Sequence, residues 1–476
     1  MSSRRQNEIL SAYNGAHIAV TGLARTSVPL IRVLSRAGAR ITVFDRKPAD
    51  ELKAQTEKLA GTVYELRAGS DAFEGIDSFD YVFPSPGINP NRPDFLTAKA
   101  EGVKFGYEIE LTMRLAECPV IGITGSSGKT TTTTLTGLIL EEACRRRGRG
   151  NVLVGGNIGQ PLVEDVLDTC ADDFVVLEMS SFQLKFLNTS PDVAAVLNIT
   201  PNHLDVHPNM EDYIASKCNI LSYQKKADFA VLGADDQNAA SLKSAAKGSI
   251  IWFSAEGPVD AGAFLRGGEL CLRSPGKADE TVMSRKDIKI PGIHNVRNVL
   301  AAMAISSVCG AEARDMLSAV RKFEGVEHRL ETAGEAAGIL YVNDSIATSP
   351  ARTMAALDAM EMPIVLIAGG YDKHLPFDSM AELALGKVKH LVTLGITAPK
   401  IEEAFKAAAA RMNAAAPVME RAATFDEAVK MADAAAVAGD VVLMSPACAS
   451  YDMFNNFEER GRRFKELVKD IISSRR

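Results

Sequence analysis

The sequence predicts an α/β protein built from three consecutive domains. Short apolar runs recur along the whole chain, and each is followed by a polar or glycine-containing loop and a helical stretch. This pattern is typical of buried parallel strands that are joined by helices. A chain of 476 residues is also too long for one ordinary domain. We expect the domains to comprise residues 1–107, 108–327 and 328–476.

The apolar runs fall into three groups that match these domains. The predicted strands are 17–22, 40–45 and 80–87, then 119–125, 174–181 and 193–200, then 339–344, 364–370, 390–395 and 440–446. Residues 250–290 are rich in charge, glycine and β-branched side chains, and they predict an antiparallel excursion inside the middle domain. The alanine-rich residues 407–423 predict a helix followed by a loop.

Composition and charge narrow the class of protein. The net charge of −7 argues against general nucleic-acid binding, because neutralising phosphates needs a basic face. The seven cysteines include no CxxC pair, which favours reduced thiols in the cytoplasm over a disulfide framework. The first residues carry no apolar signal sequence, and no apolar run approaches the roughly 18 residues of a membrane helix. We expect a cytoplasmic protein that binds small molecules and neither nucleic acid nor a membrane, and we expect it to be a monomer.

The segment TGSSGKT (124–130) follows the apolar run PVIGI and opens a helical stretch. Glycines allow backbone N–H groups to surround phosphate oxygens, and a helix N-terminus adds partial positive charge. The strict GxxxxGK[ST] pattern needs glycine where this chain has Ile123, but strand, loop and helix are all present. We expect the lysine to reach the terminal phosphates and the following hydroxyl to bind Mg²⁺. The predicted nucleotide site consists of Gly125, Ser126, Ser127, Gly128, Lys129, Thr130 and Thr131.

Two further polar residues follow the next strands of the middle domain. Glu178 ends the run FVVLE, and His203 lies in the loop beyond VAAVLNIT. Ligands of open α/β sheets bind beyond the carboxyl ends of the strands, so both residues are expected at the edge that carries the phosphate loop. Mg²⁺ prefers oxygen ligands, which makes Glu178 a natural ligand and His203 a less common one. Lys217 lies in a helical stretch, where the residue pattern alone indicates a surface lysine of an amphipathic helix.

Motifs spread over nearly the whole chain resemble the Mur ligase family, the enzymes that build the peptide stem of bacterial peptidoglycan. The motifs are ITGSSGKTTTT (123–133), VGGNIGQPL (154–162), LEMSSFQL (177–184), LNITPNHLDVH (197–207), PGIHNVRNVLAA (291–302), EHRLE (327–331), YVNDSIATSP (341–350), AGGYDK (368–373) and SPACASYDMFNNFEERGRRF (445–464). The resemblance is strongest to the D-glutamate-adding branch. It implies a Rossmann-like N-terminal domain for the UDP substrate, a central P-loop ATPase domain with a mostly parallel sheet, and a C-terminal Rossmann-like domain for the amino acid.

The resemblance also implies an activity and a set of site residues. The activity is ATP-dependent addition of D-glutamate to UDP-N-acetylmuramoyl-L-alanine through an acyl phosphate, with two Mg²⁺ ions. Lys129, Glu178, His203, Lys217 and Lys373 would be catalytic, and Lys217 would be carbamylated so that it joins Thr130, Glu178 and His203 as a metal ligand. The nucleotide would be contacted by Asn298, Arg329 and Asp344. The UDP substrate would be contacted by Gly22, Leu23, Asp45, Arg46, Ser85, Gly87, Asn157 and Ser180. The glutamate would be contacted by Thr348, Lys373, Ser450 and Phe457.

Two departures from known patterns affect these expectations. The family has a lysine in the NDS-x-AT run that helps to bind a carboxylate of glutamate, whereas this chain has Ile346. The neighbouring Thr348, Ser349, Arg352 and Lys373 are the residues that could replace it. D-Glutamate is the prediction, and the L-glutamate-adding relative is the alternative. The run GLARTS (22–27) lacks the later glycines of GxGxxG, which favours UDP over a dinucleotide.

Three other functions compete with the ligase. An oxidoreductase would use the N-terminal Rossmann-like pattern, but it leaves the SGKT loop unexplained. A non-catalytic nucleotide-binding regulatory module does not need the set of Glu178, His203 and Lys217. A folate-glutamylating relative shares the amino acid, but the segment 445–464 favours the peptidoglycan branch.

Overall fold

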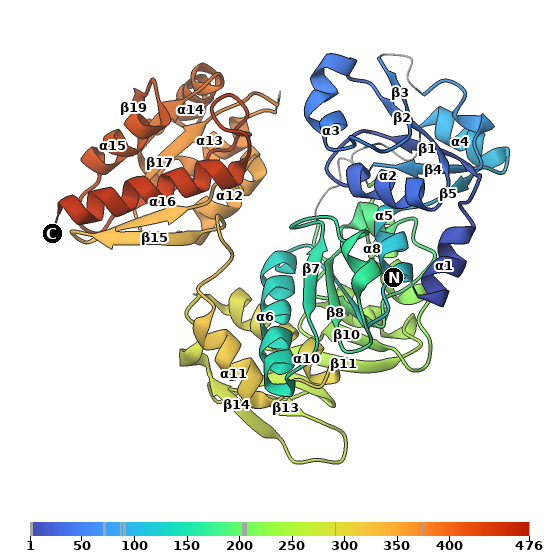
Figure 1. The fold of residues 1–476 in the computed structure, drawn as a ribbon. Helices are drawn as coiled ribbons and strands as arrows, with labels where there is room; N and C mark the ends of the chain where they lie inside the picture. Colours follow the sequence, from blue (N-terminus) through green and yellow to red (C-terminus); the bar gives the residue numbers. More distant parts are fainter. Residues whose placement is uncertain are drawn as a thin grey trace. The chain divides into compact units, whose positions relative to one another are not determined.

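The computed structural model describes residues 3–69, 73–85, 88, 92–201, 207–290, 292–360, 362–373 and 375–475. The chain divides into two compact units, Met1–Phe323 and Glu324–Arg476. Over the described residues the strands form three sheets, two in the first unit and one in the second (Figure 1). The predicted α/β class is confirmed. The predicted division of the first unit near Tyr107 falls between β5 (Lys104–Phe105) and α5 (Glu108–Leu115) and stays a prediction.

The first sheet is parallel and has the order β3-β2-β1-β4-β5 among the described strands. Its elements are α1 (Arg4–Ser11), β1 (His17–Thr21), α2 (Ser27–Arg36), β2 (Arg40–Asp45), α3 (Lys53–Glu57), β3 (Glu65–Ala68), β4 (Tyr81–Pro84), α4 (Pro93–Ala100) and β5. Strands β1, β2 and β4 correspond to the three predicted apolar runs. Strands β3 and β5 are short and have no buried residue, so the sequence carried no apolar run for them.

The second sheet has the order β14-β13-β12-β11-β10-β9-β6-β8-β7. Its strands are β6 (Val120–Thr124), β7 (Val152–Gly156), β8 (Phe174–Glu178), β9 (Val193–Val196), β10 (Phe229–Gly233), β11 (Ser249–Ser254), β12 (Gly262–Arg266), β13 (Glu269–Arg273) and β14 (Glu280–Ser284). The strands from β7 to β12 pair in parallel, and β12, β13 and β14 pair antiparallel. The predicted antiparallel excursion in residues 250–290 is therefore confirmed.

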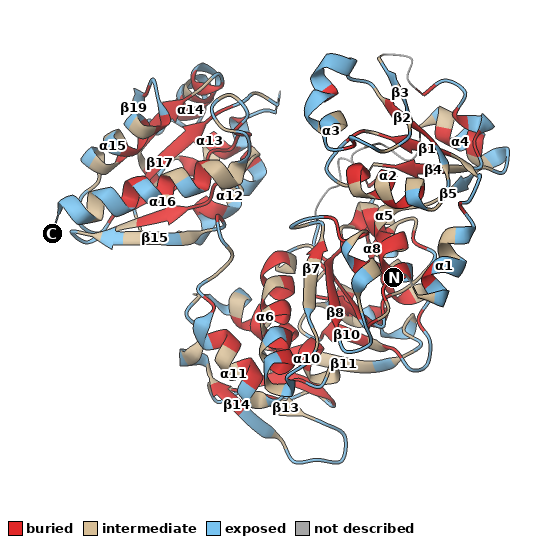
Figure 2. Cartoon of the chain, in the orientation of Figure 1, coloured by how far each residue is buried: buried red, intermediate tan, exposed pale blue. Residues whose placement is uncertain are grey.

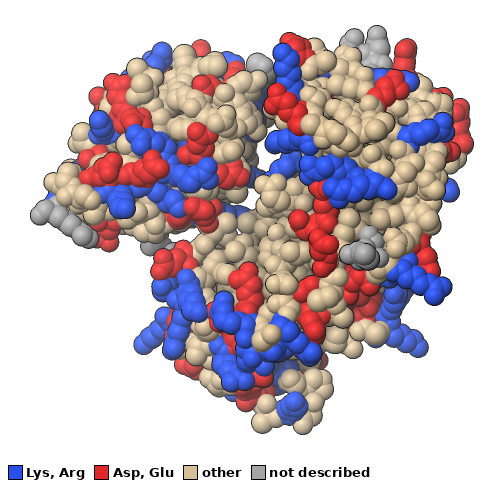
Figure 3. All heavy atoms as spheres, in the orientation of Figure 1, with Lys and Arg blue, Asp and Glu red and all other residues tan. Residues whose placement is uncertain are grey.

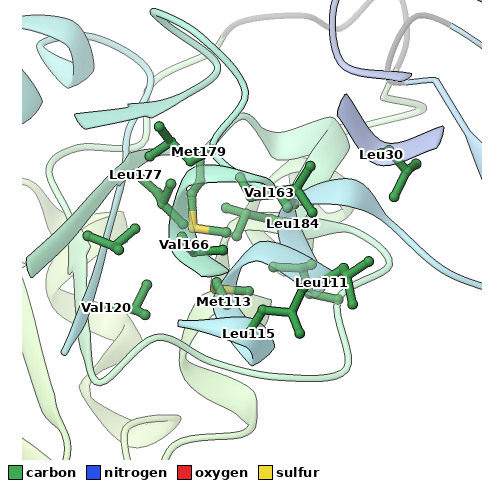
Figure 4. Packing of buried hydrophobic residues seen from close by; sticks show 14 of the residues in the cluster. Leu30, Leu111, Met113, Leu115, Val120, Val163, Val166, Leu177, Met179 and Leu184 are labelled. Carbon is green, nitrogen blue, oxygen red and sulfur yellow. The ribbon is translucent and has the colours of Figure 1, made fainter. Parts of the chain in front are cut away.

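Helices cover both faces of this second sheet, which explains why its central strands are continuous apolar runs. The helices are α5, α6 (Lys129–Arg147), α7 (Ser181–Leu184), α8 (Met210–Ser222), α9 (Gln237–Ser241), α10 (Ile293–Val308) and α11 (Ala313–Lys322). Every residue of β6 and β8 is buried (Figure 2). Figure 4 shows one part of this core, in which Met113 and Leu115 of α5 gather with Leu177, Met179 and Val166.

The second unit contains one sheet with the order β15-β16-β20-β17-β18-β19. Its elements are β15 (Glu331–Ala336), β16 (Ile339–Asn343), α12 (Pro350–Ala359), β17 (Ile364–Gly369), α13 (Asp378–Ala384), β18 (Val388–Leu394), α14 (Ala398–Met412), β19 (Val418–Arg421), α15 (Phe425–Ala435), β20 (Val441–Met444) and α16 (Phe457–Ser474). Strand β15 is antiparallel to β16, and the other pairs are parallel. The alanine-rich segment forms the expected helix up to Met412, but the predicted loop contains the edge strand β19.

Two apolar cores lie on opposite faces of this third sheet. One contains Leu357, Leu366 and Phe405, to which α12, β17 and α14 contribute. The other contains Ile367 of β17 and Phe464 of α16. Neighbouring residues of β17 therefore enter different cores, as the alternation of side chains along a strand requires.

Charged side chains of both signs are interspersed on the face of the molecule that Figure 3 shows. Ion pairs of the described residues include that of Glu142 with Arg145 and Lys322. No helix among the described residues is both long enough and apolar enough to span a membrane.

Candidate functional site

Four parallel strands of the second sheet direct polar loops to one edge. Strands β7, β8, β6 and β9 are neighbours, and their carboxyl ends carry Asn157, Glu178, the loop 125–128 and Asn198. The loop is tied to the end of β9, because the backbone N–H of Ser126 donates to the Asn198 carbonyl at 2.9 Å. The side-chain oxygen of Asn198 accepts from the Ser127 backbone N–H, also at 2.9 Å.

The two glycines of this loop occupy positions where a side chain would collide. Gly128 has φ of +79°, and a Cβ there would overlap the side-chain oxygen of Asn298. A Cβ on Gly125 would lie 2.9 Å from the Cβ of Leu197. The glycines therefore allow a tight loop that opens directly into α6. Asn298, a predicted nucleotide contact on α10, lies beside this loop.

A chain of hydrogen bonds connects α6 with β8 and β7. The Thr130 hydroxyl donates to Glu178 Oε2 at 2.7 Å, and the Asn157 amide donates to Glu178 Oε1 at 2.8 Å. Lys129 curls over its own loop, and its Nζ donates to the Gly125 carbonyl at 2.8 Å. Glu178 is only 2% exposed, so these neighbours fix its orientation. The predicted metal ligands Thr130 and Glu178 thus adjoin each other.

Lys217 of α8 reaches the same loop from the other side. It is 1% exposed, and its Nζ donates to the Gly125 carbonyl at 3.0 Å and to Thr124 Oγ1 at 3.3 Å. The residue pattern alone indicated a surface lysine, and that interpretation is wrong, because α8 turns this position into the sheet edge. Burial, with help from the nearby charge of Lys129, lowers the pKa of Lys217 to about 7.

Aromatic and histidine side chains around Lys217 were not predicted. The ring of Tyr213 lies 4.7 Å from Lys217 Nζ, and the Tyr213 hydroxyl is 3.0 Å from Ser126 Oγ. His207 is buried and joins Ser181 Oγ at 3.0 Å to Asp212 at 2.6 Å. A spacing of four residues between Tyr213 and Lys217 places both on one helix face, which is the signal that could have found the tyrosine.

Two predicted site residues, His203 and Gly87, lie outside the described residues. Ser180 lies at the edge near Glu178, where its side chain caps α7 through Gln183. Thr131 lies in the first turn of α6 and is buried.

The first sheet directs a second set of predicted residues to its own edge. Strands β2, β1 and β4 are parallel neighbours, and Asp45, Gly22 and Ser85 follow them. Asp45 accepts from the backbone N–H of Leu23 at 2.7 Å, so it fixes the loop after β1. A Cβ on Gly22, which has φ of +85°, would lie 2.8 Å from the Cβ of Ser85. Arg46 is also predicted to contact the UDP substrate. Its guanidinium lies 5.4 Å from the Phe73 ring centre.

The third sheet repeats this arrangement in the second unit. Strands β16, β20 and β17 are parallel neighbours, and the loops 344–349, 445–450 and 370–373 follow them. Asp344 accepts from Ser445 Oγ at 2.7 Å and from the backbone N–H of Leu330 at 3.2 Å. Burial raises the pKa of Asp344 to about 6. Arg329, the neighbour of Leu330 in sequence, exerts its charge on Asp344.

Three of the predicted glutamate-binding residues lie in these three loops, and the fourth begins α16. Lys373 Nζ donates to the Thr348 carbonyl at 3.3 Å, so these two predicted residues meet. Ser450 is 2% exposed, and its Oγ has no hydrogen-bond partner among the described residues. Phe457 begins α16, and its carbonyl accepts from Ser345 Oγ at 2.7 Å.

Arg460 was not predicted as a site residue, although its buried side chain lies between loops at the same edge of the third sheet. It is buried, and its guanidinium donates to Ser345 Oγ at 3.0 Å and to the carbonyls of Ser345 and Cys448 at 2.9 and 3.1 Å. Burial lowers its pKa to about 10. Arg460 thereby joins the loops after β16 and β20, and its position inside the quoted segment 445–464 gave no sign that the side chain points inward.

Two family models match this chain. The Mur ligase middle domain matches residues 123–306, and the glutamate ligase domain of Mur ligases matches residues 328–448. The first range contains the loop 125–128, Glu178 and Lys217, and the second contains the loops 344–349 and 370–373 and the start of the loop 445–450.

Relatives and solved structures agree with these models. The UDP-N-acetylmuramoylalanine–D-glutamate ligase of Symbiobacterium thermophilum is 44% identical over 95% of this chain and 98% of its own length. That of Acetivibrio thermocellus is 41% identical over 98% of both. The fold resembles UDP-N-acetylmuramate–alanine ligase MurC from Thermotoga maritima (TM-score 0.57, 19% identity, 96% of this chain and 100% of that one). It also resembles MurF from Acinetobacter baumannii (TM-score 0.56, 18% identity, 99% of both chains). The chain therefore belongs to the Mur ligase family of amide-bond-forming ligases.

Proposed function

We propose that this protein joins D-glutamate to UDP-N-acetylmuramoyl-L-alanine, with ATP converted to ADP and phosphate. The observation that carries the proposal is the convergence of Lys129, Thr130, Glu178 and Lys217 on one glycine loop. The relatives that are 44% and 41% identical over nearly the whole chain bear the name of this ligase. ATP and a UDP-linked substrate place the reaction in the cytoplasm.

The loop 125–128 has the features that a triphosphate requires. Its glycines leave no side chain between the backbone and a ligand, and it opens the 19-residue helix α6 at its positive end. Lys129 already lies over the loop and could exchange its bond to the Gly125 carbonyl for a phosphate oxygen. We assign Gly125 to Thr131 to the phosphates and Asn298 to the nucleotide, with Arg329 and Asp344 as contacts from the second unit.

The chemistry explains why phosphate transfer must precede amide formation. The carboxylate of the UDP substrate is a poor electrophile, because its leaving group would be an oxide. Transfer of the terminal phosphoryl group to that carboxylate gives an acyl phosphate, which the amine of glutamate attacks with loss of phosphate. Phosphoryl transfer depends mainly on positioning and charge neutralisation, and Lys129 can supply both. Asn157 and Ser180 lie at the same edge and are assigned to the carboxylate end of this substrate.

The residues beside the loop suit divalent cations. Thr130 and Glu178 present oxygen atoms, as Mg²⁺ prefers, and His203 completes the proposed set. Bound Mg²⁺ would neutralise the charge that develops on the phosphate oxygens. Lys217 cannot be a ligand as an ammonium, but CO₂ addition to its neutral amine would give a carboxylate. Its burial without an ion-pair partner among the described residues supports this modification.

The remaining substrates are assigned to the other two sheet edges. Gly22, Leu23, Asp45, Arg46, Ser85 and Gly87 would hold the UDP group, and Thr348, Lys373, Ser450 and Phe457 the glutamate. The L-glutamate-adding reaction is the second candidate, because Ile346 offers no cation for a carboxylate. A non-catalytic nucleotide-binding module is the alternative from a different class.

Phosphate release measures the proposal directly. Purified protein receives ATP, Mg²⁺ and UDP-N-acetylmuramoyl-L-alanine, with D-glutamate or L-glutamate in separate reactions. We expect release that needs the UDP substrate and D-glutamate. Release with L-glutamate alone would select the second candidate, and no release with either would refute the ligase and favour the non-catalytic module.

A variant of Lys217 tests the proposed carbamate. We expect Lys217→Ala to lose nearly all phosphate release, and we expect short-chain carboxylates such as formate or acetate to restore part of it. A Lys217→Ala protein with the wild-type rate would remove the carbamate from the proposal. Lys185→Ala is a suitable control, because Lys185 is a partly exposed lysine that pairs with Asp212.

A further inference from the structure

Two cations donate hydrogen bonds to one short loop of the second unit, between Asp344 and the start of α12. Arg352, in the first turn of α12, donates from Nη1 to the Ile346 carbonyl at 2.9 Å. Lys373, in the loop after β17, donates from Nζ to the Thr348 carbonyl at 3.3 Å. The two accepting residues are themselves joined, because the backbone N–H of Thr348 donates to the Ile346 carbonyl at 2.8 Å. An arginine and a lysine from different elements therefore donate to backbone carbonyls two residues apart on this loop.

Asp344, which begins this loop, is held by donors from other segments. Both oxygens of Asp344 already accept hydrogen bonds, one from Ser445 and one from Leu330. Partial desolvation and then the positive charge of Arg352 lower the pKa of Lys373. Both side chains are exposed, so a ligand can reach them. An anion bound between them would relieve their repulsion.

The proposed amino acid has two carboxylates and an amine that must stay unpaired to attack. One lysine can neutralise only one carboxylate, and the aliphatic Ile346 cannot neutralise the other. A guanidinium is always charged and matches a carboxylate with two parallel N–H groups. Arg352 is bonded to the carbonyl of Ile346 itself, so its charge lies where that residue supplies none.

We propose that Arg352 is a specificity-determining residue that binds one of the two carboxylates of the incoming glutamate, while Lys373 binds the other. The inference rests on the proposed function. It assigns to one arginine of α12 the selection of a dicarboxylic amino acid over a monocarboxylic one.

Two variants separate the charge of Arg352 from its structural bond. Arg352→Gln keeps an amide that can donate to the Ile346 carbonyl but removes the charge, and Arg352→Lys keeps the charge but removes the two-pronged donor. With the enantiomer of glutamate that the wild type accepts, we expect Arg352→Gln to raise KM about 10- to 100-fold and to change kcat much less. Arg352→Lys should lie between this variant and the wild type. Arg411→Gln, which removes an exposed arginine paired with Glu382, should behave as the wild type.

Neutral analogues of the same enantiomer give a readout that a purely structural role would not change. Glutamine lacks the side-chain carboxylate, and isoglutamine lacks the α-carboxylate. We expect the wild type to prefer glutamate over both, and Arg352→Gln to lose its preference over one of them, which identifies the carboxylate that Arg352 binds.

The possible results distinguish this inference from the proposed function. An unchanged KM with unchanged preferences would overturn the inference, and so would an equal loss of activity with all three acceptors. A wild-type protein without phosphate release with either enantiomer would refute the proposed function and this inference with it. An active wild type with an unaffected Arg352→Gln variant would refute the inference alone.

Discussion

Lys217 combines a positive charge with nearly complete burial. Its surroundings offer a carbonyl, a hydroxyl and an aromatic ring, but they offer no ion pair among the described residues. Burial without a full counter-charge disfavours the ammonium form, which is why the pKa falls to about 7. The residue therefore costs stability in its charged form, and we interpret this cost as the consequence of its role in the site.

We predict that Lys217→Met is inactive but more stable than the wild type at pH 6. In CO₂-free buffer at pH 6 the amine is charged in both the folded and the unfolded wild type, so the burial cost is fully present and the variant should gain about 2 kcal/mol. As pH rises above about 7 the folded amine loses its proton before the unfolded one does. Stability of the wild type then increases, and the advantage of the variant should shrink by pH 9. Urea unfolding of both proteins at the two pH values measures this difference.

An advantage of Lys217→Met that grows between pH 6 and pH 9 would contradict the prediction. Groups other than Lys217 titrate in both proteins, so they cancel in the comparison. Repeating the pH 9 measurement with added bicarbonate should stabilise only the wild type, because the methionine cannot be carbamylated.

Individual site residues differed in how far the sequence could predict them. Lys129, Thr130 and Glu178 were predictable from residues alone, because Glu178 ends one strand, the other two open the helix after a strand and a glycine loop, and parallel strands end at a common edge. Lys217 required the family resemblance, because a lysine in an amphipathic helical segment gives no sign of burial. Arg460 was missed for the same reason. It lies in a helix whose exposed and buried faces both contain arginines.

At the scale of elements, helix α1 is a short segment with one inward-facing polar residue. Gln6 is 1% exposed, and its amide donates to the Leu115 carbonyl at 2.9 Å and to the carbonyls of Val166 and Leu167 at 3.3 Å each. These carbonyls belong to the end of α5 and to the segment before β8. The side chain of Gln6 thus joins helix α1 to the end of α5 and to the segment before β8.

We predict that Gln6→Ala lowers the free energy of unfolding by about 1–3 kcal/mol, because it leaves buried carbonyl groups without a donor. The matched control is Glu8→Ala, which removes an exposed ion pair with Arg4 on the same helix and should change stability by less than about 1 kcal/mol. Chemical unfolding of the three proteins provides the comparison. Equal stability of Gln6→Ala and Glu8→Ala would show that α1 is not held by this side chain.

The elements that the sequence predicted are those with buried apolar runs. Strands β6, β8 and β17 are buried throughout and were predicted within three residues of their ends. Strand β19 lies at the edge of its sheet with exposed ends, so its sequence reads as a loop. The segment becomes a strand because it pairs with β18 through backbone hydrogen bonds. The hydrophobic pattern of the segment itself cannot show that pairing.

At the scale of the whole molecule, the candidate site residues are divided between the two units. The glycine loop, Glu178 and Lys217 belong to Met1–Phe323, whereas Arg352 and Lys373 belong to Glu324–Arg476. Each unit has its own sheets and its own apolar cores. The proposed reaction needs phosphate chemistry from one and an amino acid from the other, so neither unit alone can complete it.

We predict that residues 324–476 fold when they are produced alone. Their sheet is covered on both faces by helices of the same unit, and the described members of the core on each face belong to this unit. Such a unit should unfold in a single cooperative urea transition and show dispersed amide resonances. The isolated unit should also release no phosphate from ATP. A non-cooperative transition would mean that the two cores depend on the first unit, which would contradict the division at Phe323. Val468→Ala, which removes a fully buried side chain of one core, should lower the transition midpoint in the isolated unit as it does in the full chain.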